Sequence, residues 1–361
     1  RTGAPSPVSH QSIMETVAIC EETYQKLKRA EAEESVKAEV SLKRLESNLS
    51  TVDSTRGGVL VTGGTGLLGK VVAAKLRNRK FFTRVVSRKI PPESERIPGV
   101  EYVAVDLAEE IPPDLLDKIN LVVHCAAETA GGKNAHLRNS IGATKNILSA
   151  MGKAGISKFL FISSIAVLRS SHDTGKPVDE STSIVQNSEE RGPYVWGKAE
   201  SERLALELGQ SIGVTVRIIR PGPLVNFDAF EPPGRLGREV GSIFVYIGGR
   251  RSNLSLCSVR TAADVIRKYV ENFDSMPPIL NLVEPNSPTR AELVSLLLKK
   301  RPDLKAYRIP FIVLRIISPG LKLLQRILRP RQKPIDIYAA FATERYKSDL
   351  AAEIINRDMV N

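Results

Sequence analysis

Tyr194 and Lys198, in the stretch Tyr-Val-Trp-Gly-Lys, are two side chains that could transfer a proton. Residues four positions apart lie on one face of a helix, so a helical stretch would bring both to the same substrate. An unperturbed tyrosine has a pKa of about 10, and a nearby cation favours its ionised form. The pair therefore fits a general acid or base near neutral pH. Taken alone, it fits an ordinary helix surface equally well.

A glycine-rich stretch gives a second signal of chemistry. Gly63, Gly66 and Gly69 recur at every third position, directly after an apolar run and at the start of a helical pattern. Glycines here permit a tight turn and let a pyrophosphate approach the N–H groups and the positive dipole of a helix N-terminus. The strand–turn–helix context favours this interpretation over a plain glycine-rich turn. The expected dinucleotide contacts are Gly63, Thr65, Gly66, Leu67, Leu68 and Gly69.

The residues at the end of the second apolar run indicate which dinucleotide would bind. Ser87 and Arg88 stand where NAD enzymes place an acid for the ribose 2′-hydroxyl, whereas an arginine suits a 2′-phosphate. Arg84 and Lys89 add positive charge nearby. We therefore expect NADP, with NAD as the other possibility. The alternative is that these are solvated basic residues of a basic protein.

The ends of the third and fourth apolar runs supply further candidates. Asp106, followed by Leu107, could accept a hydrogen bond from an adenine amino group or could cap the segment that follows. The small side chains of Ala126 and Ala127 would leave room for a ribose and a nicotinamide. His124 is explained equally well as a packed core residue.

Short β-branched runs alternate with amphipathic helical segments from Val59 onward. Such runs indicate parallel strands in a sheet that is covered by helices on both faces. The expected strands span residues 59–63, 83–88, 101–107, 121–127, 158–164 and 215–222. Six strands of this kind fit an α/β fold with a Rossmann-type, doubly wound parallel sheet.

Changes in composition divide the chain into three expected regions. Residues 1–56 are a helical N-terminal extension or linker, charged and then broken by a Gly-containing turn. Residues 57–225 are the NAD(P)-binding Rossmann domain. Residues 226–361 are a smaller α/β region that binds substrate or acts as a lid, and the sheet can receive segments from it.

Bulk composition limits the classes of function. Hydrophobic residues make up 42% of the 361 residues, which suits a folded chain with a large core. The net charge of +12 favours anionic partners, but 5% aromatic residues offer no stacking platform for nucleic acid. Three cysteines without metal spacing predict a reducing, cytoplasmic location and no metal site. The absence of an initial Met suggests a piece of a longer chain.

Residues 309–334 are apolar and basic together. One interpretation is an amphipathic helix pair that contacts a membrane surface weakly. The favoured alternative is a helical lid that buries its apolar face on the domain and breaks at Ser318-Pro319-Gly320.

Five ordered motifs between residues 59 and 223 resemble the extended branch of the short-chain dehydrogenase/reductase family, which includes NAD-dependent epimerases and dehydratases and 3β-hydroxysteroid dehydrogenase-like enzymes. The motifs are TGGTGLLG, HCAA, the segment from Asn139 through FISSIAVL, YVWGK and RPGPLV. The resemblance implies that Ser164 polarises a substrate hydroxyl or carbonyl, that Tyr194 transfers the proton, and that Lys198 binds the nicotinamide ribose and lowers the tyrosine's pKa. Asn139 and Pro221 join the cofactor-binding set.

The resemblance implies an NAD(P)-dependent oxidoreductase or epimerase that acts as a homodimer on a hydroxyl or ketone of a sugar or nucleotide-sugar. Dehydration is not expected, because Ile165 and Ala166 replace the Asp-Glu pair of the 4,6-dehydratases. Asp264 resembles a family motif whose usual histidine is replaced near Arg260, which weakens any particular nucleotide-sugar. The alternatives are a membrane-surface reductase of a lipid- or steroid-like substrate and a non-catalytic NADP-binding sensor.

Residues 4–30 resemble the C-terminal end of Gfo/Idh/MocA-type oxidoreductases. This second resemblance implies that the chain is fused to, or paired with, such an enzyme. The alternative is an ordinary N-terminal helical extension.

Overall fold

The computed structural model describes residues 53–171, 175–328, 341 and 344–357. The chain forms two units, residues 1–51 with 92–99 and residues 52–91 with 100–361. All elements below belong to the second unit, apart from the short η2 (Glu93–Glu95). The N-terminal extension and its second resemblance lie outside the described residues.

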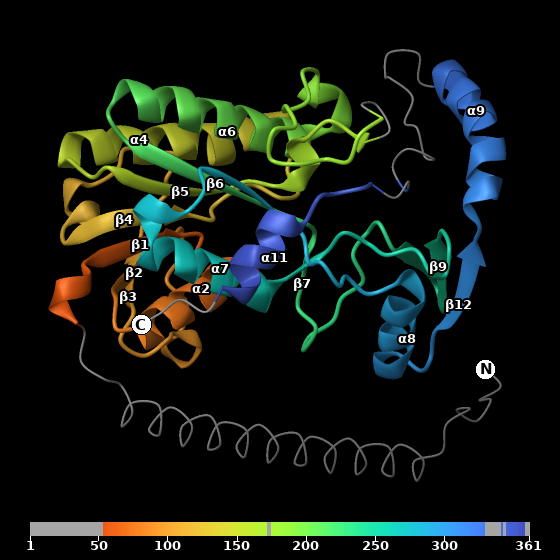
Figure 1. Ribbon diagram of the computed structural model, residues 1–361, viewed down its shortest axis with the longest axis horizontal. Helices are drawn as coiled ribbons and strands as arrows, with labels where there is room; N and C mark the ends of the chain where they lie inside the picture. The colour runs from red at the N-terminus through yellow and green to blue at the C-terminus, as the bar shows by residue number, and fades with distance from the viewer. Residues whose placement is uncertain (1–52, 172–174, 329–340, 342–343, 358–361) are drawn as a thin grey trace, which may run out of the picture. The chain divides into compact units, whose positions relative to one another are not determined.

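A seven-stranded parallel sheet is the centre of the second unit (Figure 1). Its order is β11-β6-β5-β4-β1-β2-β3, so the direction of winding reverses between β1 and β4. The expected doubly wound Rossmann-type sheet is confirmed. The strands are β1 (Gly58–Thr62), β2 (Phe82–Ser87), β3 (Glu101–Ala104), β4 (Ile119–His124), β5 (Lys158–Ile162), β6 (Thr215–Pro221) and β11 (Ile279–Leu282).

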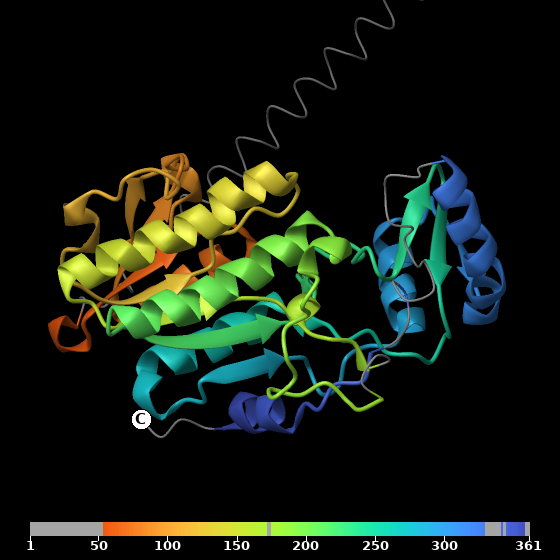
Figure 2. The same ribbon diagram turned by 90° about the horizontal axis from the view of Figure 1, so that it is seen from above.

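Helices cover both faces of this sheet, which explains why its strands are almost continuously apolar. Helices α4 and α6 lie on one face, and α2 and α7 lie on the other (Figures 1 and 2). All five residues of β1 are buried. The helices are α2 (Leu67–Asn78), α3 (Lys133–His136), α4 (Ala143–Ala154), α6 (Pro193–Ser211), α7 (Val259–Glu271) and α11 (Asp349–Asn356).

Strand β11 comes from the later part of the chain, beyond the six strands expected from the sequence. Its four residues pair in parallel with Ile218–Pro221 of β6. Before it, α7 packs beside α2, and after it α11 returns to the same side of the sheet (Figure 1). The sheet thus receives segments from the region after residue 226.

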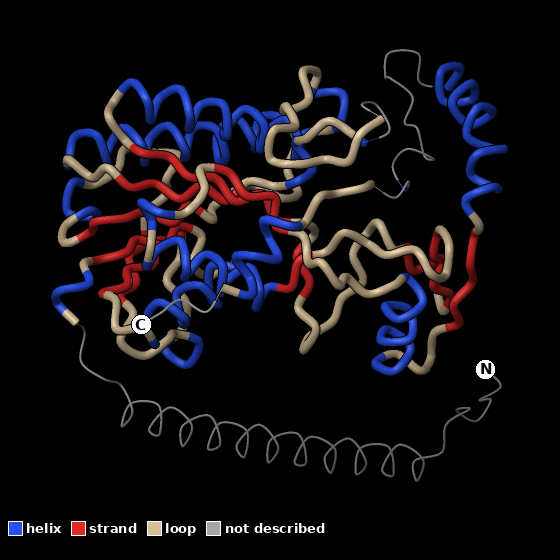
Figure 3. The backbone as a smooth tube through the Cα atoms, viewed as in Figure 1, coloured by secondary structure: helices blue, strands red, loops and turns tan. Residues whose placement is uncertain are grey.

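A smaller α/β layer carries the rest of the later chain. Strands β8 (Gly237–Val240) and β9 (Ile243–Ile247) form an antiparallel hairpin, and β12 (Lys305–Ile309) pairs in parallel with β9. Helix α8 (Arg290–Lys300) starts at a capping box between Thr289 and Glu292 and buries Leu293 and Leu297 in a separate core. The alternation of strand and helix is visible in Figure 3. Strand β7 (Leu224–Val225) forms a separate two-stranded parallel pair with β10 (Cys257–Ser258).

Helix α9 (Phe311–Leu328) differs from the favoured expectation of a lid with a buried apolar face. It continues through Pro319 as one helix, and only Leu314 and Ser318 are buried in it. The aliphatic side chains on its outer face are exposed, among them Ile312, Ile316 and Leu323. The buried-lid interpretation is wrong because one narrow stripe, not the apolar face, meets the domain.

Helix α6 is tied to the sheet by a buried ion pair. Glu202 is fully buried and accepts hydrogen bonds from Arg220 in β6, with the Nε bond at 3.0 Å. The hydroxyl of Ser163, just after β5, donates to the same carboxylate. Atom Nη1 of Arg220 is buried without a hydrogen-bond partner. Removal of either charge would therefore leave the other one buried and unpaired.

Glu202→Gln should lower the free energy of unfolding by about 3–5 kcal/mol, because it leaves the Arg220 guanidinium uncompensated. Urea denaturation followed by circular dichroism measures this change. Asp274→Asn is the matched control: it breaks an exposed pair with Lys158 and should cost less than about 1 kcal/mol. Equal costs for the two variants would contradict the structural role assigned to Glu202.

Candidate active site

A cavity of about 1410 Å³ opens at the carboxyl ends of the parallel strands, where α/β sheets of this winding bind ligands. The cavity is lined by all the residues that the sequence predicted as catalytic or cofactor-binding. The lining includes Gly63, Thr65, Gly66, Leu67, Leu68, Gly69, Ser87, Arg88, Asp106, Leu107, Ala126, Ala127, Asn139, Ser164, Tyr194, Lys198 and Pro221.

The turn between β1 and α2 leaves no space for side chains at two of its glycines. Gly63 has a φ of +64°, and a Cβ there would lie 2.9 Å from the backbone of Ala126. A Cβ on Gly69 would lie 2.3 Å from the carbonyl oxygen of Gly63. The first turn of α2 can therefore lie directly against the loop after β1.

This turn fits the pyrophosphate of a dinucleotide. The N-cap of α2 is Gly66, which has no side chain that could cap the N–H groups of the first turn. Leu67 and Leu68, in the first turn, line the cavity. Unpaired N–H groups and the helix dipole at such an end attract an anion.

The end of β2 shows which of its basic residues could meet a ribose phosphate. Arg88 is exposed and lines the cavity, and the hydroxyl of Ser87 donates to the Lys89 carbonyl at 2.7 Å. Arg84 points elsewhere: its guanidinium bonds the carbonyls of residues 114, 115 and 117 and pairs with Glu101. The expectation that Arg84 adds charge at the cofactor site is wrong, because it lies on the strand face that packs under the 113–117 turn.

Asp106 has the capping role that was the simpler of its two interpretations. Its Oδ1 accepts the N–H of Ala108 at 3.0 Å, and its Oδ2 pairs with Arg138 at 2.8 Å. These contacts hold the pKa of the carboxyl below its ordinary value. Because Asp106 also lines the cavity, the adenine contact stays a prediction.

Tyr194 and Lys198 lie on the first turns of α6, which begins at a sharp break in the chain. Gly192 has a φ of 100°, and Pro193 follows at the first helical position, where its fixed φ suits a helix start. Burial raises the pKa of Tyr194, and a hydrogen bond with Ser164 opposes this rise. The pKa of Tyr194 is thus raised, whereas the sequence analysis expected Lys198 to lower it.

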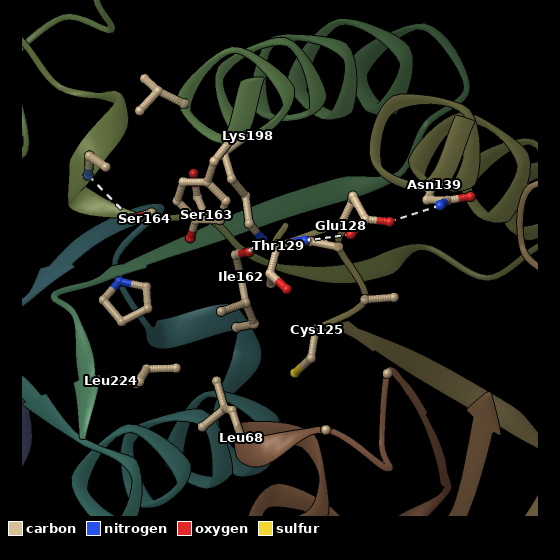
Figure 4. A pocket seen from close by; sticks show the side chains of 18 of the residues that line it. Leu68, Cys125, Glu128, Thr129, Asn139, Ile162, Ser163, Ser164, Lys198 and Leu224 are labelled. Atoms are coloured by element: carbon tan, nitrogen blue, oxygen red, sulfur yellow. Dashed lines mark hydrogen bonds between the residues drawn. The ribbon is translucent and has the colours of Figure 1, made fainter. Parts of the chain in front are cut away.

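Lys198 is buried and reaches from α6 to the end of β5 (Figure 4). Its Nζ donates to the Ile162 carbonyl at 2.6 Å and lies 5.5 Å from the centre of the Phe161 ring. Burial lowers the pKa of the ammonium to about 8, against opposing effects of Cys125 and Glu202. The bond fixes the helix that carries Tyr194 to the strand that precedes Ser164.

Gly197 has a role in this arrangement that the sequence analysis did not give it. A Cβ at this position would lie 2.5 Å from Nδ1 of His136, so only glycine lets that imidazole pack against α6. The His136 ring in turn meets Tyr194 edge to face, with ring centres 6.3 Å apart. The imidazole therefore packs against both α6 and the tyrosine ring.

Glu128, which sequence reasoning missed, organises the loop after β4. Its Oε1 accepts the backbone N–H groups of residues 129–131, and its Oε2 accepts the side-chain amide of Asn139 at 2.9 Å (Figure 4). The Asn139 bond is the largest of several that lower the pKa of this carboxyl to about 2. A carboxylate four residues after the end of a strand carries no signal of this kind in the sequence.

Besides Arg88, three arginines line the cavity. They are Arg169, Arg191 and Arg235, and Glu344 and Tyr346 from near the C-terminal end of the described chain line it as well. Glu344 accepts hydrogen bonds from the hydroxyl of Ser170 at 2.7 Å and from the backbone and hydroxyl of Ser171. Only the folded chain brings these segments together, and no motif marks them.

Two residues singled out from the sequence lie outside the cavity lining. His124 is buried between the hydroxyls of Thr62 and Thr144, and burial lowers its pKa to about 3, so its role is packing. Asp264 lies on α7 and pairs with Lys75 of α2 at 2.8 Å.

Comparison with known proteins identifies this arrangement. The model of the "NAD dependent epimerase/dehydratase family" matches residues 59–230. The UDP-glucose 4-epimerase of Klebsiella pneumoniae is 31% identical over 125 residues, which cover 30% of this chain and 90% of that protein. The chain belongs to the NAD dependent epimerase/dehydratase family. This is the extended short-chain dehydrogenase/reductase group, as its motifs indicated.

Other family members cover different activities. A putative dihydroflavonol 4-reductase of Synechocystis is 29% identical over 48% of this chain and 51% of its own length. A 3 beta-hydroxysteroid dehydrogenase/isomerase of Mycobacterium tuberculosis is 27% identical over 46% of each chain. The chain thus spans about half the length of these curated relatives.

Solved structures show the same fold over more of the chain. The protein gox2253 aligns with a TM-score of 0.64 at 21% identity, over 82% of this chain and 92% of that one. TunA, an NAD dependent NDP-hexosamine 5,6-dehydratase, aligns with a TM-score of 0.59 at 17% identity, over 84% of this chain and 92% of that one. The family fold therefore includes the smaller C-terminal layer.

The depressed pKa of Lys198 predicts a pH-dependent stability. Between about pH 8 and its ordinary value of 10.5, the unfolded lysine keeps a proton that the folded one has lost. The contribution of Lys198 to the free energy of unfolding should therefore rise with pH, by at most about 1.4 kcal/mol per pH unit. Urea denaturation of wild type and Lys198→Met across this window gives the contribution as a difference.

The difference is needed because half-buried Cys125, whose pKa is raised to about 12, acts in the opposite direction. Lys153→Met, which removes an exposed lysine of α4, is the control and should give a flat difference. A flat difference for Lys198→Met as well would show that the amine keeps its ordinary pKa.

Proposed function

We propose that the protein is an NAD(P)-dependent oxidoreductase or epimerase that acts on a hydroxyl or ketone of an anionic, sugar-like substrate. One observation carries the proposal: Ser164, Tyr194 and Lys198 line the same cavity as the glycine turn of β1 and α2. A non-catalytic sensor would need the glycine turn but not these three side chains.

Each of the three residues has a distinct task in this proposal. Ser164 holds the substrate oxygen beside the phenol of Tyr194, which lines the same cavity. Tyr194 gives a proton to that oxygen in reduction and takes it back in oxidation. Lys198 places a buried positive charge one helical turn away, which stabilises negative charge on the reacting oxygen. A nicotinamide cofactor supplies the hydride chemistry when bound.

The arginines that line the cavity support an anionic substrate. Arg169, Arg191 and Arg235 line the same cavity as Ser164. Guanidinium groups match phosphate and carboxylate oxygens in geometry and in charge. A nucleoside diphosphate-sugar combines a sugar hydroxyl with such an anion, and several neighbours in fold act on this class.

Tyr194→Phe should lower turnover by about a hundredfold to ten-thousandfold, because it removes the proton donor. Mass spectrometry of ligands carried through purification names the substrate to assay, and nicotinamide absorbance follows the reaction. Affinity for the cofactor, measured by calorimetry, should stay the same.

Tyr307→Phe, at an exposed tyrosine of β12, is the matched control and should leave turnover unchanged. The proposed function is wrong if the chain binds neither NADH nor NADPH, or if Tyr194→Phe retains full turnover.

Arg88 supports NADP as the preferred form, since its exposed guanidinium lines the cavity at the end of β2. Arg88→Glu should weaken NADPH binding by about tenfold to a hundredfold, the value of one hydrogen bond to a charged group. NADH binding should change little. Lys89→Glu makes the same charge change at a neighbour outside the cavity lining and should leave the NADPH preference intact; equal effects of both variants would argue against a specific phosphate contact.

A further inference from the structure

Helix α9 presents a broad apolar face to solvent. Exposed fractions reach 71% for Ile316, 61% for Leu323 and 68% for Ile327. The other exposed aliphatic side chains of the helix are Ile312, Val313, Ile317, Leu324 and Leu328. Soluble proteins rarely leave so many large aliphatic side chains together in water unless the surface binds something.

Positively charged residues border this face along one side. At 100° per residue, the exposed aliphatic residues cover the arc from Ile312 to Leu328, about 160° wide. Arg315, Lys322 and Arg326 share a stripe next to that arc, and buried Leu314 lies beyond its other border. The sequence of α9 contains no aspartate or glutamate.

The orientation of α9 is fixed at its first turn. The ring of Phe311 lies under the guanidinium of Arg290, 5.5 Å from its centre. Arg290 is only 1% exposed and also donates to the Arg235 carbonyl at 2.8 Å and to the Ser252 hydroxyl at 3.1 Å. Leu314 packs one turn later on the same side. These contacts hold the apolar arc away from the domain.

We propose that α9 docks on the surface of an anionic phospholipid membrane, in the plane of the interface. Its aliphatic arc would enter the boundary between headgroups and acyl chains, and Arg315 and Arg326 would lie at the level of the phosphates. Among the residues that the structure describes, no helix combines the length and the hydropathy needed to cross a bilayer. The proposal goes beyond the chemistry of the active site and does not depend on it.

Charge favours a lipid surface over a second copy of the chain. Two copies of α9 would bring stripes of the same sign together with no acidic residue from either helix to pair with them, which opposes association. An anionic headgroup layer supplies the missing negative charge. Each basic residue near such a surface adds about fivefold to binding.

Sedimentation of the full chain with vesicles tests the proposal. Wild type should bind vesicles of phosphatidylcholine with phosphatidylglycerol more tightly than phosphatidylcholine alone, and added salt should weaken the difference. Ile316→Glu with Leu323→Glu should weaken binding by about a hundredfold or more, the loss of two buried aliphatic side chains. Val240→Glu, at a 66% exposed valine of β8, is the matched control and should bind like wild type.

Charge is tested separately by Arg315→Gln with Arg326→Gln. This pair should weaken binding to the anionic vesicles about 25-fold and leave binding to neutral vesicles unchanged. NADPH binding by every variant checks that the fold is intact.

Two results would overturn the proposal. In one, wild type binds anionic vesicles no better than the Ile316→Glu, Leu323→Glu variant does. In the other, wild type ignores vesicles but is a dimer by light scattering that this variant converts to a monomer, which would make the apolar arc a surface for self-association.

Discussion

The bond from the Lys198 ammonium to the Ile162 carbonyl is the interaction on which the site depends. It joins α6, which carries the tyrosine, to the end of β5, which carries Ser164, in a place from which water is excluded. Such burial is costly for a charge. One turn along α6, Glu202 offsets part of this cost and pairs with Arg220 of β6. Helix α6 and strands β5 and β6 are thereby locked together around the proposed site of proton transfer.

The parts of this site that the sequence predicted are those set by local geometry. The turn through Gly63 and Gly69 needs glycine because a Cβ at either position would collide with backbone atoms. The glycines therefore recur at a fixed spacing that can be recognised in the sequence. Tyr194 and Lys198 are positioned by one helix, so their separation along the chain is already a separation in space. The parallel sheet could likewise be predicted from the sequence, because strands covered on both faces are apolar throughout.

The parts that could not be predicted depend on contacts between distant segments. β11 completes the sheet from beyond residue 270, and Glu344 bonds Ser170 across a separation of 174 residues. Arg84 looked like one more cation near Arg88, but it lies within β2, where three carbonyls and Glu101 satisfy it, whereas Arg88 follows the end of the strand. Its residue type was informative, and its place along the strand decided its role.

Helix α9 shows why the pattern of a helix does not reveal what covers it. An amphipathic stretch predicts an apolar face, and a lid and a membrane contact use the same periodicity. The structure distinguishes the lid from the membrane contact, because the contact between Arg290 and Phe311 orients α9 so that the arc around Ile316 is exposed to solvent. The same arginine bonds the carbonyl of Arg235, a residue of the cavity wall. The proposed docking surface and the cavity wall at Arg235 therefore share one buried side chain, so displacement of α9 and the position of Arg235 cannot be independent.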